Sequence, residues 1–413
     1  MPKGFYALIA AQFASGLADN VLMILGIFFL QEQGYPGWWA PLLKFSFNLA
    51  YVALPSVVGP VADALPKAPL MAAMNWLKSG SVVLLLLGLH PLLAFALSGL
   101  AAAIYAPAKY AIVTESVHSS LLVKANAWLE VSVVMSVLLG IALGGWLIGG
   151  VHSIQTMGLW PVTDGLVSIV PTQALPAFLA VLLIYGLSII LNSRVGNTMS
   201  SKVHAPLKPL ALTWRAFWVC NLKLWRDPLG GISLYVTTLF WGVGAVLQFA
   251  VLLWAQGEMG LSLQQGAYLQ ALVAVGVVCG AFLAARSFKI FNARHVLPWG
   301  MLLSILMPLM AYTRTLWLAI PLLIVSGSIA GMLLVPMNAL LQHRGAKILS
   351  PGRSIAVQGF NENLSVLIML GAYSTLLTME LPLQTIMLIL GLLLLCGLLF
   401  LQARIKPRKG RFS

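Results

Sequence analysis

Charged residues are scarce in this chain of 413 residues. Asp, Glu, Lys and Arg together make up 8% of the sequence, and only ten residues are acidic. Soluble globular domains carry about 25% charged residues. The chain is instead 60% hydrophobic, with a mean hydropathy of +0.95. This composition excludes an ordinary soluble domain and indicates a membrane protein.

Groups that carry chemistry or bind metals are also few. The three cysteines (Cys220, Cys279 and Cys396) have no paired spacing, all six histidines are isolated, and no GxxxxGK[ST] loop is present. These absences give no hint of a disulfide framework, a metal site or a nucleotide site. An enzyme acting on lipids needs a nucleophile–base pair or a metal set, and neither is visible. We therefore expect no cofactor and no enzymatic activity.

Apolar runs of about 20 residues recur along the whole chain, each long enough to cross the ~30 Å hydrocarbon core of a bilayer. The first is too long for a cleavable signal peptide and lacks a small-residue cleavage site. We predict an all-α polytopic membrane protein with twelve transmembrane helices, at about 5–30, 40–62, 69–89, 92–113, 125–149, 174–193, 229–255, 265–285, 295–312, 316–341, 354–377 and 383–402.

The net charge of +14 follows membrane topology. If both termini are cytoplasmic, 20 of the 24 Lys and Arg residues fall on the cytoplasmic side and only Arg314 falls outside. This asymmetry is a strong positive-inside signal. It accounts for the basic balance without a nucleic-acid partner and predicts a multi-pass protein with both termini in the cytoplasm.

Six spans precede and six follow a polar stretch, which predicts an N-terminal half (1–193), a cytoplasmic linker (194–228) and a C-terminal half with a basic tail (229–413). In the linker, Trp214, Phe217, Trp218, Leu222 and Trp225 recur at helical spacing. That pattern suits an amphipathic helix lying in the membrane interface. The alternative is a linker that is merely solvated.

The two halves resemble each other. Pro-Ala-Lys at 107–109 corresponds to Pro-Met-Asn at 336–338, and the same offset of about 229 positions takes Asp19 to Gln248. A repeat that preserves the order and direction of six spans is the parallel-repeat plan of major facilitator transporters. We therefore predict a major facilitator fold with two pseudo-symmetric six-helix halves.

A short motif between the second and third spans agrees with this fold. Gly59-Pro-Val-Ala-Asp63, followed by Lys67, resembles the loop motif of that superfamily. In this motif a glycine permits close packing and an aspartate caps or salt-bridges a neighbouring helix. Ala64, Pro66 and Ala68 depart from the usual pattern. We expect Asp63 and Lys67 to act in gating rather than in substrate recognition.

Three carboxylates, Asp19, Glu130 and Glu362, lie inside apolar spans. A charge at bilayer depth costs at least ~2.5–3.5 kcal/mol, so each is a candidate functional residue. Lys78 and Lys109 lie at membrane depth as well, which suits a cargo carrying both a phosphate and an ammonium group. We expect Asp19, beside Asn20, and Gln248 near the midplane, and a charge network nearer the cytoplasm, formed by Lys78, Lys109, Glu130 and Glu362.

Structural roles compete with these functional ones. Asp19 can make a structural hydrogen bond with Asn20, and Lys109 can snorkel to the inner interface. Lys78 and Glu130 can pair with one another or with Lys109 as an interhelical lock. The sequence leaves these alternatives open.

Several strings along nearly the whole chain resemble the lysophospholipid transporter family of bacterial inner membranes, a branch of the major facilitator superfamily. They are Ala18-Asp-Asn20, Asn75-Trp-Leu-Lys78, Tyr105-Ala-Pro-Ala-Lys-Tyr110, Leu122-Val-Lys-Ala-Asn126 with Glu130, Phe240-Trp-Gly242, Val335-Pro-Met-Asn-Ala-Leu-Leu-Gln342 with Arg344-Gly345, and Ala356-Val-Gln358 with Glu362-Asn363.

The resemblance implies flipping of lysophosphatidylethanolamine and related lysolipids from the outer to the inner leaflet. An acyltransferase/acyl carrier protein synthetase on the cytoplasmic side would then complete phospholipid remodelling. It also implies cavity roles for Asp19, Asn20, Lys109 and Glu130. Related sequences carry an Arg near the position of Gln248, so this chain departs from them at a possible phosphate anchor.

Two other functions remain open from the sequence. An ion-coupled exporter of amphiphilic drugs on the same fold would use Asp19 or Glu130 as the ion site, since desolvation can raise the pKa of a membrane carboxylate. A scaffold without transport would dock an acyltransferase through the basic linker. Drug export driven by a pH gradient distinguishes the first, and partner binding without lipid flux distinguishes the second.

Overall fold

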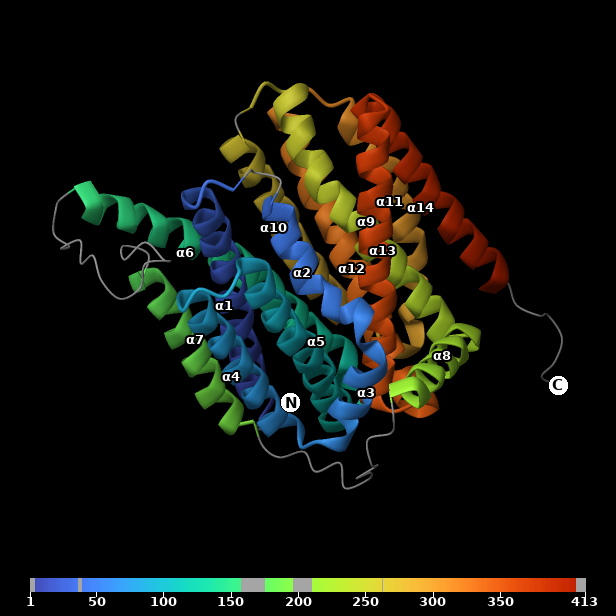
Figure 1. Ribbon diagram of the computed structural model, residues 1–413. Helices are drawn as coiled ribbons and strands as arrows, with labels where there is room; N and C mark the ends of the chain where they lie inside the picture. Colours follow the sequence, from blue (N-terminus) through green and yellow to red (C-terminus); the bar gives the residue numbers. More distant parts are fainter. Residues whose placement is uncertain (1–3, 36–38, 157–174, 196–209, 262, 406–413) are drawn as a thin grey trace. The chain divides into compact units, whose positions relative to one another are not determined.

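The computed structural model describes residues 4–35, 39–156, 175–195, 210–261 and 263–405, and these residues form helices and short connections, with no β-strand among them (Figure 1). The α-helices of this described part are α1 (Phe5–Glu32), α2 (Trp39–Ala53), α3 (Pro55–Ala64), α4 (Lys67–Leu86), α5 (Pro91–Ser116), α6 (Leu122–Thr156), α7 (Leu175–Ser193), α8 (Leu210–Arg226), α9 (Gly230–Gly257), α10 (Leu263–Ser287), α11 (Leu297–Ala311), α12 (Leu316–Ile348), α13 (Pro351–Thr378) and α14 (Leu383–Ile405). The all-α prediction is confirmed.

Each of the predicted spans coincides with a helix, or with the pair α2 and α3 for the span at 40–62. Within the described ranges, nine helices are long and apolar enough to cross a membrane, or ten if α2 and α3 count as one bent span. Helix α11 has only 15 residues, and α13 carries Arg353, Glu362 and several amides. Twelve spans require that α11 and α13 also cross the membrane, and this stays a prediction.

The second predicted span is not straight. Helices α2 and α3 meet at Leu54 with a bend of 70°. Pro55 is the first residue of α3, where it has no N–H to donate and its ring displaces the preceding turn. The backbone amides of Val57 and Val58 accordingly bond to the carbonyl of Leu54, which starts a new helix.

The chain forms two compact units. The first comprises Met1–His118, Ser132–Asn221 and Gly345–Phe360, and the second comprises Ser119–Val131, Leu222–Arg344 and Asn361–Ser413. In the first unit, α1, α4 and α7 pack side by side (Figure 1). Their apolar core includes Ala18, Val82 and Tyr185. This core therefore extends to Asp19 and the polar residues around it.

In the second unit, glycines let α10 and α12 approach closely. Gly276 and Gly280 on α10 face α12, and Gly327 and Gly331 on α12 face α10. A Cβ atom added at any of the four would overlap backbone of the opposite helix. Both pairs have the small-xxx-small spacing typical of close helix packing in membranes.

The second part of the predicted linker is helix α8, as the spacing of its aromatic residues indicates. Phe217 is buried and stacks edge-on against Phe360, whereas Trp218, next to it, is 51% exposed. The basic residues Lys223 and Arg226 lie in the last turn. Its position in a membrane interface stays a prediction, and residues 196–209 of the linker lie outside the described part.

Candidate functional site

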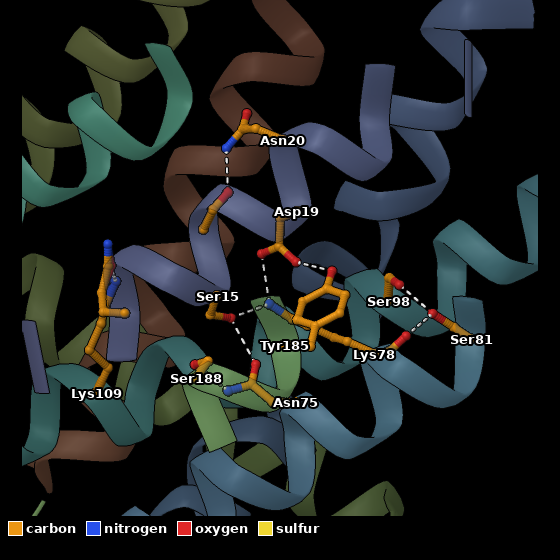
Figure 2. A network of polar contacts seen from close by, with 12 residues as sticks. Ser15, Asp19, Asn20, Asn75, Lys78, Ser81, Ser98, Lys109, Tyr185 and Ser188 are labelled. Carbon is orange, nitrogen blue, oxygen red and sulfur yellow. Dashed lines mark hydrogen bonds and ion pairs between the residues drawn. The ribbon is translucent and has the colours of Figure 1, made fainter. Parts of the chain in front are cut away.

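The two oppositely charged residues Asp19 and Lys78 form an ion pair between α1 and α4. The Nζ atom of Lys78 lies 2.7 Å from Oδ2 of Asp19 (Figure 2). The Lys78 side chain is only 2% exposed, whereas that of Asp19 is 19% exposed. Asp19 is therefore the member of the pair that a third group can reach.

Helix α7 supplies the second donor to the same carboxylate. The hydroxyl of Tyr185 donates a hydrogen bond of 2.7 Å to Oδ1 of Asp19. Each carboxylate oxygen thus has one strong donor, an ammonium on one side and a phenol on the other (Figure 2). The ammonium of Lys78 also lies 5.8 Å from the centre of the Tyr185 ring. Hydrogen bonds to both oxygens fix the orientation of the carboxylate.

A series of linked, buried hydrogen bonds supports the Asp19–Lys78 pair. Lys78 donates to the hydroxyl of Ser15 at 3.0 Å, and Ser15 donates to Oδ1 of Asn75 at 2.8 Å. Asn75 then donates to the hydroxyl of Ser188 at 2.8 Å, and Ser188 donates to the carbonyl of Ala11 at 2.7 Å. The series passes between α1, α4 and α7 and returns to α1. Buried polar groups that are fully paired in this way make a site rigid.

The spacing of polar residues explains why these three helices meet here. Each helix carries two polar residues one turn apart, which places both on one face. These are Ser15 and Asp19 on α1, Asn75 and Lys78 on α4, and Tyr185 and Ser188 on α7. Tyr185, Ser15 and Ser188 are not among the residues predicted from the sequence, although this spacing could have identified them.

The Asp19–Lys78 pair also differs from the predicted arrangement, which placed Asp19 with Gln248 and Lys78 in a separate network. Asp19 is about 14 residues into α1 and Lys78 about 11 residues into α4, a difference in depth of only ~4–5 Å. The two charges were therefore at compatible depths. Sequence alone does not show which side of each helix faces the other.

Lys109 is in a second polar group, apart from the Asp19 pair (Figure 2). It follows Pro107 inside α5, is 8% exposed, and has its Nζ atom 3.5 Å from Oε1 of Gln12 on α1. The amide of Gln12 donates in turn to Ser132 at 3.4 Å, and Lys109 lies 4.5 Å from the ring centre of Tyr110. Lys109 thus places a buried ammonium beside the amide of Gln12 and the ring of Tyr110.

Asn20 does not hydrogen-bond with Asp19 through its amide nitrogen. That nitrogen donates instead to the carbonyl of Gly16 one turn earlier, at 2.7 Å. Asn20 also packs closely on α6, since a Cβ atom added at Gly140 would lie 2.6 Å from its Cβ atom. The structure thus places Asn20 at the contact between α1 and α6. This position is beside the Asp19 site, to which Asn20 was predicted to belong.

Three further predicted residues belong to the second compact unit: Glu130 on α6, Gln248 on α9 and Glu362 on α13. Glu130 and Glu362 are half-buried, and Gln248 is exposed. The backbone carbonyl of Gln248 accepts a hydrogen bond from the side-chain amide of Gln270. A shared role for these side chains and Asp19 stays a prediction.

The motif at 59–67 does not form a loop, because residues 59–64 belong to α3 and Lys67 begins α4. Its side chains nevertheless make the contacts expected of the motif. Asp63 accepts a hydrogen bond of 2.9 Å from the backbone amide of Gly352 and another from the hydroxyl of Ser350, at the start of α13. A Cβ atom added at Gly59 would lie 3.0 Å from Cα of Arg353, so this glycine does permit close packing. Lys67 pairs with Glu115 at 3.3 Å. A carboxylate at a helix N-terminus is stabilising.

The second unit has an ion pair that was not predicted from the sequence. Asp227 precedes α9 and accepts from the backbone amides of Leu229 and Gly230, at 3.2 and 2.7 Å. Arg344, near the end of α12, binds both its oxygens, at 3.1 and 2.6 Å. Burial alone would raise the pKa of the Asp227 carboxyl, but Arg344 and the two amides outweigh burial and lower it.

No cluster of three or more His, Cys, Asp or Glu side chains able to hold a metal is found in the described ranges. The side chains that the structure places at the site supply an ion pair and hydrogen bonds. The site can bind polar and charged groups within an apolar helical protein.

Known proteins resemble this chain over nearly its whole length. The model of the Major Facilitator Superfamily matches residues 8–368. The lysophospholipid transporter LplT of Yersinia pestis (strain Pestoides F) is 33% identical over 383 residues, which cover 92% of this chain and 89% of that protein. LplT of Yersinia pseudotuberculosis serotype O:3 (strain YPIII) gives the same identity and coverage.

Solved transporters share the fold. The fucose:proton symporter FucP of E. coli superposes with a TM-score of 0.76 at 14% identity, covering 97% of this chain and 98% of that one. The human organic anion transporter TETRAN superposes with a TM-score of 0.73 at 16% identity, covering 97% and 100%. This chain therefore belongs to the Major Facilitator Superfamily and, within it, to the family of the lysophospholipid transporter LplT.

Proposed function

We propose that this protein carries lysophospholipids across a membrane by alternating access. The observation that carries the proposal is the Asp19–Lys78 ion pair, which lies within apolar helices of a chain that is 33% identical to LplT over 92% of its length. A lysophospholipid combines a charged headgroup with one acyl chain. It needs polar groups at membrane depth and an apolar surface around them.

In this proposal the headgroup binds at Asp19, Asn20 and Lys109 of the first unit. Glu130 and Gln248, the other two residues proposed to bind substrate, belong to the second unit. Asp19 on α1 and Lys109 on α5 are charges of opposite sign in the first unit. A carboxylate suits an ammonium group and a lysine suits a phosphate. The neutral Gln248 contributes hydrogen bonds but no charge.

Gating is assigned to Asp63, Lys67, Lys78 and Glu362. Asp63 holds the start of α13 through Gly352 and Ser350, and Lys67 holds the end of α5 through Glu115. These bonds join segments distant in sequence. A carrier that changes the side of access must be able to break and remake such bonds.

We place the protein in a bacterial inner membrane with both termini in the cytoplasm, because the basic residues are concentrated on one side of the predicted spans. Two six-helix halves joined by residues 194–228 then rock about the bound lipid. Lysolipid flipped to the inner leaflet is a substrate for a cytoplasmic acyltransferase/acyl carrier protein synthetase. The protein itself supplies transport and performs no reaction.

Uptake of labelled lysophosphatidylethanolamine into spheroplasts that make the protein tests this function. We expect protein-dependent uptake that Asp19→Ala lowers at least roughly ten-fold, the loss expected when a charged contact of about 1.5–3 kcal/mol is removed. Glu380→Ala is the matched control, because Glu380 is an exposed acidic residue between α13 and α14. It should transport normally.

Absence of uptake by folded, membrane-inserted wild-type protein contradicts the proposal. In that case, export of amphiphilic drugs stimulated by a pH gradient is the next activity to measure. Equal uptake by wild type and Asp19→Ala contradicts the assignment of the binding site but leaves lipid transport standing.

A further inference from the structure

We call Asp19, Lys78 and Tyr185 the Asp19 cluster. In it, the accessible carboxylate of Asp19 accepts hydrogen bonds from the enclosed donors Lys78 and Tyr185. Lys78 is 2% exposed in its side chain and the Tyr185 residue is fully buried, whereas the Asp19 side chain is 19% exposed. Lys78 is surrounded by Ser15 and by the rings of Tyr105 and Tyr185, 5.3 and 5.8 Å from its Nζ atom. A ligand approaching this cluster therefore meets the carboxylate before it meets the ammonium.

The donors occupy one position on each oxygen and leave further lone pairs. A carboxylate has about four acceptor positions. Lys78 takes one on Oδ2 and Tyr185 takes one on Oδ1. The remaining positions on the exposed side can accept additional N–H groups. An ammonium offers three such donors and a positive charge, whereas a glycerol headgroup offers neutral hydroxyls.

The support behind Lys78 keeps this arrangement fixed. The chain from Lys78 through Ser15, Asn75 and Ser188 ends on the backbone carbonyl of Ala11, so its last acceptor belongs to α1 itself. Movement of Lys78 would break several buried bonds together, and buried polar groups are costly to leave unpaired. Lys78 is therefore a poor candidate for direct exchange with a lipid phosphate.

We infer that Lys78 and Tyr185 are positioning residues, which hold the Asp19 carboxylate in one orientation so that it binds the ammonium group of a zwitterionic lysophospholipid headgroup. The inference rests on the proposed function and specifies it: Asp19 selects headgroups with an ammonium over headgroups with only hydroxyls. With this inference, Lys78 is assigned to holding Asp19 and no longer to gating.

The test compares uptake of two labelled lipids, lysophosphatidylethanolamine and lysophosphatidylglycerol, by the full-length protein in spheroplasts. Asp19→Asn should lower uptake of the ethanolamine lipid relative to the glycerol lipid by roughly ten-fold, because the amide keeps the shape and loses the charge. Tyr185→Phe should shift the same ratio by roughly two- to ten-fold, the effect of one hydrogen bond.

Tyr105→Phe is the matched control for Tyr185→Phe. Both tyrosines lie with their rings against Lys78, and both substitutions remove one oxygen atom, but the hydroxyl bond to Asp19 comes from Tyr185. The Tyr105 variant should keep the wild-type ratio of the two lipids. Equal ratios in the two variants overturn the inference.

A charge exchange separates positioning from simple structural pairing. Asp19→Lys combined with Lys78→Asp restores an ion pair between α1 and α4, so the folded yield should recover relative to either single variant. Uptake of the ethanolamine lipid should stay low, because the accessible group is then a cation. Recovery of that uptake would show that only the pairing matters.

The outcomes distinguish the two proposals. Wild-type protein that moves neither lipid overturns the proposed function, and the inference falls with it. Wild-type protein that moves both lipids, together with an Asp19→Asn variant that slows both equally, overturns only the inference.

Discussion

Lys78 is almost completely enclosed, so its charge depends on Asp19 for compensation. Taking a charged group out of water costs several kcal/mol, and an ion pair offsets this cost only while both members are present. Ser15 completes the surroundings of the ammonium by accepting a second bond. Removal of one charge is therefore worse for stability than removal of both.

Lys78→Met should leave the Asp19 carboxylate without its cation and lower the free energy of unfolding by about 3–5 kcal/mol. Asp19→Asn combined with Lys78→Met should lose distinctly less, since neither charge remains. Thermal unfolding in detergent, followed by the loss of the monodisperse peak on size-exclusion chromatography, measures both. Simple addition of the two single effects in the double variant would contradict this interpretation of the pair.

Asp227 gives a pH-dependent prediction, because Arg344 and the amides of Gly230 and Leu229 lower the pKa of its carboxyl in the folded protein. Its contribution is fully present above the unfolded pKa of about 3.9 and is lost as pH falls through the lower folded pKa. Asp227→Asn should therefore lower stability by about 1.5 kcal/mol at pH 7. The difference from wild type should shrink as the pH falls below about 4. A difference that is constant from pH 7 to pH 3 in melting experiments contradicts this assignment.

At the residue scale, the sequence shows how deep in the membrane a charged residue lies, but not which way its side chain faces. Asp19, Lys78 and Lys109 stand out because charges in apolar spans are costly, and the structure places all three among buried polar groups. Their partners depend on how each helix is rotated about its axis. The partner of Lys78 could not be chosen from sequence, because several carboxylates lie within a few turns of the same depth.

At the scale of helices, apolar length predicted the elements and proline did not by itself predict their breaks. Helices α5 and α12 continue through Pro107 and Pro336, whereas the chain bends by 70° before Pro55. A proline inside a helix removes one backbone hydrogen bond. Whether the helix then breaks depends on packing by neighbouring helices, which the sequence of one segment does not contain.

The contact of α10 with α12 requires glycine at four positions and gives an element-scale prediction. Gly280→Ala places a Cβ atom against the carbonyl oxygen of Ser328, which is backbone and cannot rotate away. The helices must separate, and we expect a loss of about 1–3 kcal/mol, as for overpacking in a core. Melting of the purified protein in detergent measures the loss.

Gly244→Ala is the control for that substitution. Gly244 lies inside α9, and an added Cβ atom would meet nothing within 4 Å. Alanine is the better helix former, so the change should be neutral or stabilising by up to about 1 kcal/mol. Equal destabilisation at positions 244 and 280 would assign the effect to glycine flexibility and not to helix contact.

At the scale of the whole molecule, pairs of residues far apart in sequence hold segments together at definite points. Asn126 at the start of α6 and Gln342 near the end of α12 exchange two side-chain hydrogen bonds, of 3.0 and 2.8 Å, and both side chains are buried. They are 216 positions apart. The second compact unit contains both, because it takes in the first turns of α6.

This amide pair separates stability from transport. Asn126→Leu leaves the buried amide of Gln342 without its partner and should cost about 1–3 kcal/mol, whereas Leu at both positions replaces the pair by apolar groups and should be nearly neutral. A carrier that changes access must loosen contacts between distant segments. If this pair opens in each cycle, the double variant keeps wild-type melting but changes the rate of lysophosphatidylethanolamine uptake, because apolar contact lacks the directional bonds that define one state. Wild-type uptake by the stable double variant would assign the pair to folding alone.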